Sequence, residues 1–278
     1  MSIHTSGLVR DLEVLELLGT DAAWENEGLG VGDIARTLKR DKGQISRVCQ
    51  TLAGIGLINR DRHTRRYRLG HHLYALAMRT QEAHLALLAR PTLLELMAQA
   101  EESSHLTVLR GGAIMTIHTE LAQHPERDDS FDGVSLPALK TASGLAILST
   151  FTSGELAAWW EEHGQARERP VNARDDRPPE LKEMKKLRQQ PGSIRSLTKL
   201  QRLCKETRKL GYAISDGQLT YNIVDAAAPL RNGSGLVVGA IAVGARKNRI
   251  RDGYQGLGGL VEESAHHLSK RLGWRAED

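Results

Sequence analysis

The side chains between residues 36 and 68 carry the chemistry needed to bind nucleic acid. This segment contains ten basic and two acidic residues, a net charge of +8, so the rest of a chain with a net charge of +4 sums to −4. Arginine and glutamine side chains pair bidentately with base edges, and basic side chains contact phosphates. A nucleic-acid-binding module attached to a slightly acidic body fits this distribution. A run of solvated charges is the alternative that charge alone leaves open.

The candidate contacts fall into two groups. The first group is expected on a helix that enters the major groove and comprises Lys42, Gln44, Ser46, Arg47 and Gln50. The second group is expected to contact phosphates or the minor groove from a basic turn and comprises Arg62, Arg65 and Arg66. A pair of helices must position the first group, and a hairpin must position the second.

Hydrophobic periodicity predicts those elements. Apolar residues recur at helical spacing in three segments and alternate in two shorter ones. The predicted helices cover residues 8–18, 31–38 and 42–52, and the predicted strands cover residues 57–60 and 66–69. Asp41 is the expected N-cap of the third helix. The pattern predicts a winged helix-turn-helix with the third helix as its recognition helix. A winged helix that binds RNA or protein is the alternative.

Six stretches of the chain match the pattern of one known family. They are Gly32–Val48, Thr51–Ile58, Tyr67–Leu73, Lys140–Leu148, Gly211–Asp216 and Tyr221–Leu230. In these stretches the chain resembles the IclR-type bacterial transcriptional regulators, and it departs from the family's usual residues at Lys140, at Asp225 and over residues 220–222. The resemblance implies dimers formed through the DNA-binding half, commonly assembled as tetramers. It also implies a GAF-like sensor domain with a ligand cavity on one face of its sheet.

The remainder of the chain predicts an α+β domain, an antiparallel sheet flanked by helices. Residues 70–89 predict a connecting helix, and Pro91 is expected to start a new one. Strands are predicted over residues 104–110, 113–119, 134–136, 212–215, 223–230 and 236–245. Further helices are predicted over residues 141–151, 154–163, 197–209 and 255–272. An exposed loop is predicted over residues 167–179.

Three parts are expected along the chain. They are a winged helix-turn-helix domain over residues 1–70, a linker helix over 71–90 and an effector-binding sensor domain over 91–278. The linker helix has surplus apolar residues, which are expected to pack against a second chain. Packing onto the helix's own domain is the alternative.

A polar helix opening and a carboxylate in an apolar strand are the candidates for effector binding. Free N–H groups and hydroxyls at the start of the predicted helix 141–151 favour an anion. The expected effector-binding residues are Lys140, Thr141, Ser143, Gly144, Tyr221 and Asp225. Lys140 is expected to attract a ligand carboxylate, and Asp225 to accept a hydrogen bond from a ligand hydroxyl or amide. Tyr221 is expected to stack alongside.

An aromatic acid such as a hydroxybenzoate fits if Lys140 and Asp225 lie at opposite ends of the ligand. Simpler roles remain open for the same residues. Thr141 and Ser143 can serve only as helix caps. Lys140 and Asp225 can form an ion pair that only closes the cavity.

Motifs that the sequence lacks argue against several classes of site. The chain has no Gly-x-Ser-x-Gly elbow, phosphate-binding loop, His-Glu-x-x-His or Cys-x-x-Cys. Cys49 and Cys204 are expected to be buried, inert thiols. Adjacent histidines diverge on a helix, so no metal or cofactor is expected. The longest charge-free apolar stretches have 14 residues, fewer than the roughly 20 of a membrane span, and no export signal is evident. A cytoplasmic location is expected.

The sequence therefore predicts a transcription factor and not an enzyme. It is expected to bind double-stranded operator DNA and to sense a small organic acid. Two alternatives remain: an enzyme acting on a small organic acid with an appended DNA-binding module, and an architectural DNA-binding protein without an effector.

Overall fold

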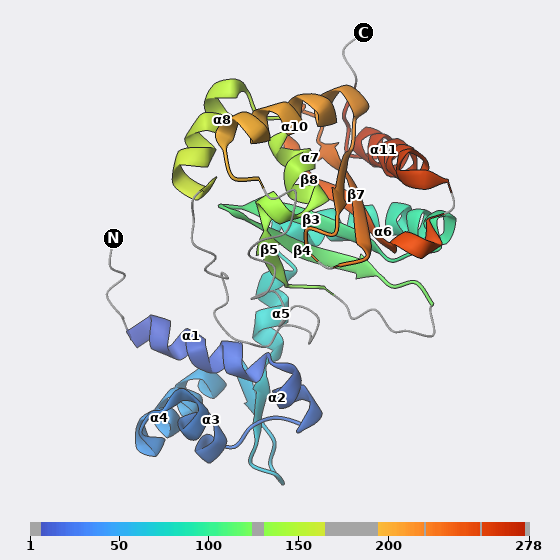
Figure 1. The fold of residues 1–278 in the computed structure, drawn as a ribbon. Helices are drawn as coiled ribbons and strands as arrows, with labels where there is room; N and C mark the ends of the chain where they lie inside the picture. The colour runs from blue at the N-terminus through green and yellow to red at the C-terminus, as the bar shows by residue number, and fades with distance from the viewer. Residues whose placement is uncertain (1–6, 124–130, 165–193, 220, 251, 276–278) are drawn as a thin grey trace. The chain divides into compact units, whose positions relative to one another are not determined.

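The computed structural model describes residues 7–123, 131–164, 194–219, 221–250 and 252–275 (Figure 1). The chain forms two compact units, residues 1–84 and 85–278. Each unit has its own hydrophobic core. The predicted exposed loop at residues 167–179 lies outside the described residues.

The first unit contains the predicted helices and strands together with one helix that the sequence did not indicate. Its elements are α1 (Gly7–Leu18), α2 (Asp21–Glu25), α3 (Val31–Leu38), α4 (Lys42–Gly54), β1 (Ile58–Arg60), β2 (Tyr67–Leu69) and α5 (His71–Ala77). The additional helix, α2, is too short to show a helical period. The sequence does hold a signal for the start of α2, because threonine is a common N-cap residue. In the structure the Thr20 side chain accepts a hydrogen bond from the Ala23 N–H at 3.3 Å.

The core of the first unit joins its helices to the strand pair. Val14 of α1, Ile34 of α3 and Ile45 of α4 are fully buried, together with Tyr67 of β2. The backbone of Leu29 also pairs with Tyr67, which adds a third short strand segment beside β2. With its apolar face packed in this core, α4 leaves its polar face to solvent.

The predicted single connecting helix over residues 70–89 is wrong. The chain forms α5 and then α6 (Gln81–Ala100), with a break between them, and Pro91 lies inside α6 instead of starting a helix. Thr80 makes the break: its hydroxyl donates to the Ala77 carbonyl at 2.7 Å and accepts from the Ala83 N–H at 3.2 Å. Proline within a helix loses one backbone hydrogen bond. Burial of Leu93 and its neighbours in the second unit's core offsets that loss.

The second unit is built on one six-stranded antiparallel sheet with strand order β5-β4-β3-β8-β7-β6. The strands are β3 (Ser104–Arg110), β4 (Ala113–Glu120), β5 (Ser135–Pro137), β6 (Ala213–Asp216), β7 (Ile223–Arg231) and β8 (Val237–Arg246). Each differs from its predicted range by at most one residue at either end. The predicted α+β class, with its GAF-like domain, is confirmed.

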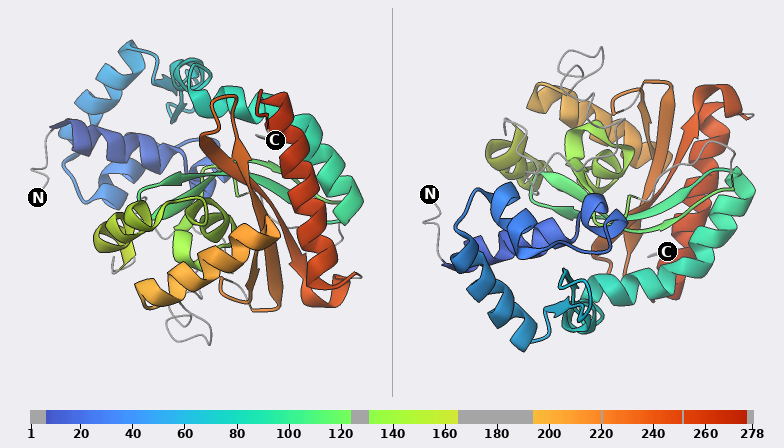
Figure 2. Two further views of the ribbon diagram at one scale, coloured as in Figure 1. Left: turned by 90° about the horizontal axis from the view of Figure 1, so that it is seen from above. Right: turned by 90° about the horizontal axis from the view of Figure 1, so that it is seen from below.

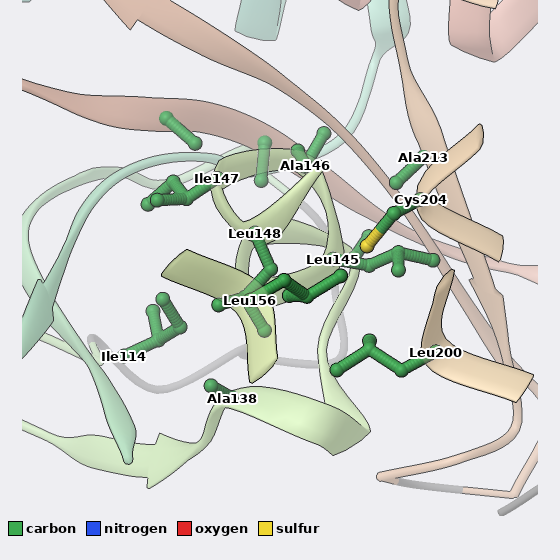
Figure 3. Packing of buried hydrophobic residues seen from close by; sticks show 14 of the residues in the cluster. Ile114, Ala138, Leu145, Ala146, Ile147, Leu148, Leu156, Leu200, Cys204 and Ala213 are labelled. Atoms are coloured by element: carbon green, nitrogen blue, oxygen red, sulfur yellow. The ribbon is translucent and has the colours of Figure 1, made fainter. Parts of the chain in front are cut away.

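Helices cover both faces of this sheet (Figure 2). On one face lie α6 and α11 (Gly253–Arg271), and on the other lie α7 (Ala142–Leu148), α8 (Ser153–Trp159) and α10 (Leu197–Leu210). Successive strand residues alternate between the faces. Thus Leu106 packs with α6 and α11, whereas Ala240 and Ala242 face α7. Figure 3 shows Leu145 and Leu148 of α7 packed with Leu200 of α10.

Short irregular helices complete the second unit. They are the 3-10 turns η1 (Ala138–Lys140) and η4 (Lys247–Arg249) and the π-helical turn η2 (Trp160–Gly164). No helix in the described ranges is long and apolar enough to cross a membrane.

Candidate functional site

The start of α4 is fixed by a capping residue, as predicted. The Asp41 side chain accepts a hydrogen bond from the Gln44 N–H at 2.9 Å. This cap places Lys42 in the first turn of the helix, where it is exposed, as are Arg47 and Gln50 further along. Gln44 and Ser46 are half-buried. Three of the five predicted contacts are therefore exposed, and none of the five is fully buried.

The structure divides the ten basic residues of the segment 36–68 into two groups. Five make contacts inside the unit: Arg36 with Asp33, Arg40 with Glu13, Arg60 with the Tyr67 ring, Arg66 with two carbonyls and Arg68 with Glu27. For the other five, no side-chain hydrogen bond or ion pair to a described residue is formed: Lys39, Lys42, Arg47, Arg62 and Arg65. These five basic side chains lie in the α3–α4 helix pair and at the tip of the turn between β1 and β2.

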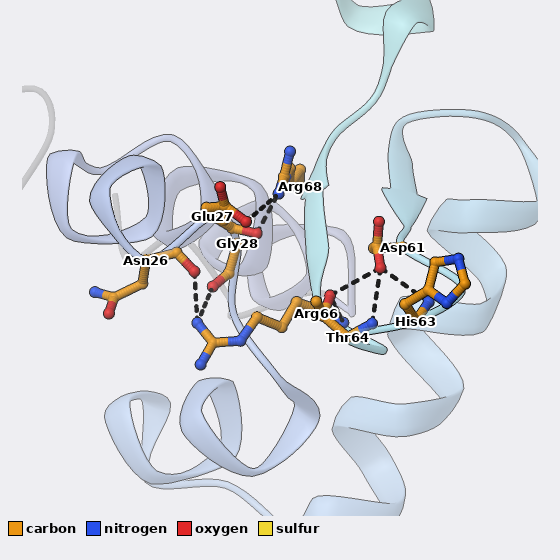
Figure 4. Close-up of polar contacts among 8 residues, drawn as sticks. All are labelled: Asn26, Glu27, Gly28, Asp61, His63, Thr64, Arg66 and Arg68. Carbon is orange, nitrogen blue, oxygen red and sulfur yellow. Dashed lines mark hydrogen bonds and ion pairs between the residues drawn. The ribbon is translucent and has the colours of Figure 1, made fainter.

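A network around Asp61 shapes the wing, the turn between β1 and β2 (Figure 4). Asp61 Oδ1 accepts hydrogen bonds from the backbone N–H groups of His63 and Thr64 and from the Thr64 hydroxyl, at 2.7–3.0 Å. These bonds lower the pKa of Asp61, so the carboxylate stays ionised and keeps the turn closed. The turn presents Arg62 and Arg65 to solvent.

Arg66 has a structural role that the sequence did not indicate. Its guanidinium donates to the carbonyl oxygens of Asn26 and Gly28 and so ties β2 to the α2–α3 connection (Figure 4). Gly28 has a φ of +103°, and a Cβ there would lie 2.6 Å from the Tyr67 carbonyl oxygen, so only glycine fits. The predicted phosphate contact of Arg66 remains a prediction, alongside this internal contact.

In the second unit, the polar opening of α7 is used for capping and close packing. Thr141 accepts a hydrogen bond from the Gly144 N–H at 3.0 Å and donates to the Ala138 carbonyl. A Cβ on Gly144 would lie 2.0 Å from that same carbonyl oxygen, so α7 and η1 are in tight contact. Ser143 is buried. The geometry supports the capping role for Thr141.

Asp225 lies on the α7 side of the sheet with small residues around it. It is directly opposite Ser215 of β6 and Gly244 of β8. A Cβ on Gly244 would lie 3.1 Å from Asp225 Oδ1, so the glycine leaves room for the carboxyl. The side chain makes no hydrogen bond or ion pair with a described residue and is partly accessible to solvent. Enough protein surrounds it that burial raises the pKa of Asp225 to about 7.

Lys140 and Asp225 lie near the same end of this face. The Ser215 hydroxyl donates to the main-chain oxygen of Lys140 at 3.3 Å, and Ser215 is the cross-strand neighbour of Asp225. The main-chain positions of Lys140 and Asp225 therefore do not support the expectation that the two side chains bind opposite ends of a ligand. Tyr221, which was expected to stack beside Asp225, is 76% exposed.

His105 is a candidate site residue that the sequence reasoning missed. It lies on the same face of the sheet as Asp225, with Nδ1 3.2 Å from the Thr119 hydroxyl and its ring against the edge of Phe131. Burial lowers the pKa of His105 to about 4, so the imidazole is neutral at pH 7. A signal was present, because polar residues at positions 105 and 107 alternate with apolar ones in the predicted strand 104–110.

The cysteines are buried, as expected. Burial raises the pKa values of Cys49 and Cys204 to about 11, which keeps both as thiols at pH 7. Within the described residues no group of three or more His, Cys, Asp or Glu side chains could hold a metal ion.

Comparison with known proteins establishes the family. A sequence model described as "Bacterial transcriptional regulator IclR C-terminal" matches residues 77–196 and 180–270. The chain belongs to the IclR family. The glycerol operon regulatory protein of Streptomyces coelicolor is 27% identical to this IclR-family chain over 279 residues, 98% of each sequence. The p-hydroxybenzoate hydroxylase transcriptional activator of Acinetobacter baylyi is 23% identical over 259 residues, 90% of this chain and 85% of the relative.

Solved IclR-family structures share the fold over nearly the whole chain. The Thermotoga maritima IclR has a TM-score of 0.71 and 19% identity, covering 98% of this chain and 100% of that one. An IclR homologue from Microbacterium hydrocarbonoxydans, complexed with 4-hydroxybenzoate, has a TM-score of 0.74 and 20% identity, covering 96% and 99%. The predicted family membership is therefore confirmed.

Proposed function

We propose that this IclR-family chain binds double-stranded operator DNA through α4 and the wing, and that a small organic acid bound in its second unit changes that affinity. One observation carries the DNA-binding part. The five basic residues of the segment 36–68 that lack internal partners among the described residues lie on the α3–α4 pair and the wing tip. The proposed division is winged helix-turn-helix 1–70, linker 71–90 and sensor 91–278.

The proposed contacts follow from exposure and chemistry. Lys42, Gln44 and Arg47 reach base edges in the major groove, with Ser46 and Gln50 beside them. Arg62 and Arg65 contact phosphates or the minor groove, and Arg66 uses guanidinium donors left over from its two carbonyl contacts. Phosphate contacts weaken binding to all sequences when they are removed, whereas base contacts determine which sequence is bound.

Fluorescence anisotropy with a duplex selected by the chain from a randomised library tests this assignment. Replacing Arg62 and Arg65 with alanine is expected to weaken binding and to lower the salt slope by about 1 for each phosphate interaction that the substitution removes. Arg47→Ala is expected to relax sequence preference. Arg202→Ala is the matched control, because it removes the same charge from an exposed site on α10. Equal effects from the control and the wing variants would contradict the proposal.

For the effector we propose an aromatic acid whose carboxylate lies at the end of the sheet face where the Lys140 main chain and Asp225 are found. Lys140 supplies a positive charge, and Ser143 and the capped start of α7 lie close by. While protonated, Asp225 can donate a hydrogen bond to the carboxylate. This role replaces the expected acceptance of a ligand hydroxyl. The relatives named for p-hydroxybenzoate hydroxylase and complexed with 4-hydroxybenzoate support this ligand class.

We expect the chain to act as a homodimer or as a dimer of dimers. Several apolar side chains of α5, its C-cap and α6 are exposed: Tyr74, Leu76, Met78 and Leu87. A helix that exposes this much apolar surface buries it best against a second chain. Analytical ultracentrifugation of the full chain tests this expectation, and a monomer at micromolar concentration would contradict it.

An enzyme acting on the same acid is the competing function. The relatives described above are regulators. Mass spectrometry of 4-hydroxybenzoate after long incubation with the chain distinguishes the two functions. A sensor returns the ligand intact, whereas an enzyme converts it.

A further inference from the structure

The α7-side face of the sheet is incompletely covered at His105 and at Asp225. Most residues on this face, such as Ala227 and Ala240, are fully buried beneath α7, α8 and α10. His105, Asp225 and Gly244 are instead partly accessible to solvent. These two polar side chains lie in β3 and β7, on either side of β8.

The stretch of β8 between the two side chains is flat. His105 is opposite Ala242 of β8, and Asp225 is opposite Gly244, two residues further along the same strand. Two strand spacings across the sheet and two residues along it place the Cα atoms of His105 and Asp225 roughly 12 Å apart. Ala242 is buried and Gly244 is partly accessible, so a flat molecule that lies over this stretch of β8 meets only a methyl group and a hydrogen from the strand itself. A para-substituted benzene ring with a hydrogen bond at each end spans such a separation.

An apolar wall flanks the His105 end. Phe131 and Val134, which precede β5, and Leu219, which follows β6, pack around the buried Leu136. Phe131 also contacts the His105 ring, with ring centroids 5.7 Å apart and the planes nearly perpendicular. An apolar wall beside the His105 end suits a ligand with an apolar, aromatic body.

One ring nitrogen of His105, Nδ1, contacts the protein, and the other, Nε2, makes no hydrogen bond with a described residue. Nδ1 lies 3.2 Å from the Thr119 hydroxyl. If Nδ1 carries the proton, Nε2 accepts a hydrogen bond, and if it does not, Nε2 donates. A hydroxyl can serve either tautomer, because it both donates and accepts. A neutral imidazole offers no charge to attract a second carboxylate.

We propose that His105 selects the effector: its Nε2 binds a hydroxyl at the far end of a flat aromatic acid whose carboxylate lies at the Lys140–Asp225 end. This inference rests on the proposed sensing function and adds the residue that distinguishes hydroxylated from plain acids. Thr119 is a positioning residue, since it holds the ring through Nδ1.

Isothermal titration calorimetry on the full chain, with 4-hydroxybenzoate and benzoate as a matched pair, tests the proposal. The unaltered chain is expected to bind 4-hydroxybenzoate about tenfold more tightly, the worth of one good hydrogen bond. His105→Phe is expected to reduce this preference to less than about twofold. His105→Gln, which keeps a side-chain donor and acceptor, is expected to retain part of it. Thr119→Val is expected to lower it without removing it.

His118→Phe is the matched control. His118 lies on the neighbouring strand opposite Leu106, a residue that faces α6 and α11. This variant should keep the full preference, and thermal unfolding identifies any variant that fails to fold. An unchanged preference in folded His105→Phe and His105→Gln would overturn the role of His105.

Failure of the inference is distinguishable from failure of the proposed function. Absence of binding by both acids to the unaltered chain would overturn the aromatic-acid assignment. The DNA-binding assay is independent of both acids. If the unaltered chain does not bind DNA specifically, the proposed function as a DNA-binding regulator is contradicted instead.

Discussion

At the scale of single residues, Asp225 is a carboxyl group whose protonation changes near neutral pH. Its carboxyl lies in an apolar strand without a hydrogen-bonding partner among the described residues, and burial raises its pKa from an ordinary 3.8 to about 7. His105 on the same face has a pKa of about 4 and stays neutral above pH 6. Asp225 is therefore expected to dominate the pH response of this face between pH 6 and 8.

We expect affinity for benzoate to fall as pH rises from 6 to 8. The protonated carboxyl donates to the ligand carboxylate, whereas the ionised form repels it, so binding favours the low-pH state. The loss should approach about tenfold for each pH unit above the pKa. Calorimetry at both pH values measures it, and Asp225→Asn should give a flat profile. Affinity that rises with pH would show that Asp225 accepts a hydrogen bond from the ligand instead.

Asp225→Asn should also stabilise the protein at pH 8. Because the folded-state pKa is raised, the folded chain binds more protons than the unfolded chain between about pH 4 and 7. The contribution of Asp225 to stability is therefore present below pH 4 and is lost as pH rises through 7. The variant should gain up to about 4 kcal/mol at pH 8 and little at pH 4. Urea unfolding at both pH values measures the difference, and equal gains would contradict the assignment.

At the scale of elements, the arginines of the wing have two roles: some hold the wing in place, and others project from it into solvent. Arg66 holds β2 to the α2–α3 connection through two carbonyl oxygens, whereas the exposed Arg62 side chain makes no hydrogen bond or ion pair with a described residue. Both side chains have the same charge and were predicted to contact phosphates or the minor groove. Their different environments give them different roles in stability.

Arg66→Ala is expected to lower the free energy of unfolding by about 2 kcal/mol, since two carbonyls lose a charged donor. Arg62→Ala is the matched control and should change stability by less than about 0.5 kcal/mol while weakening DNA binding. Thermal unfolding and fluorescence anisotropy on both variants separate the two effects. Similar unfolding temperatures for both variants would show that the Arg66 contacts contribute little.

At the scale of the whole molecule, sensing requires a coupling free energy between the two units. Such couplings typically amount to about 1–3 kcal/mol, a change of about 5–150-fold in affinity, and they are reciprocal. We therefore expect 4-hydroxybenzoate to change affinity for the selected duplex and the duplex to change affinity for 4-hydroxybenzoate by the same factor. Anisotropy and calorimetry measure the two factors. Binding of both partners with no mutual effect in affinity or footprint would contradict the proposed sensing.

Local patterns in the sequence were sufficient to predict most elements and the location of the DNA-binding segment. Helical and alternating periods predicted α3, α4 and the six strands of the sheet, because those patterns depend on neighbours within a few residues. The same reasoning misjudged the connection between α5 and α6, where the Thr80 cap and the burial of α6 overrode the usual placement of Pro91. Tertiary packing can override such local rules.

Which polar residues share a site depends on the tertiary structure. Strand order and register place His105 and Asp225 on one face, and a hydrogen bond joins the Lys140 main chain to Ser215, the cross-strand neighbour of Asp225. Tertiary packing likewise determines that Arg66 is used inside the unit while Arg62 is not. Such pairings join segments distant in the chain. Their geometry depends on register and packing, which no local pattern of residues encodes.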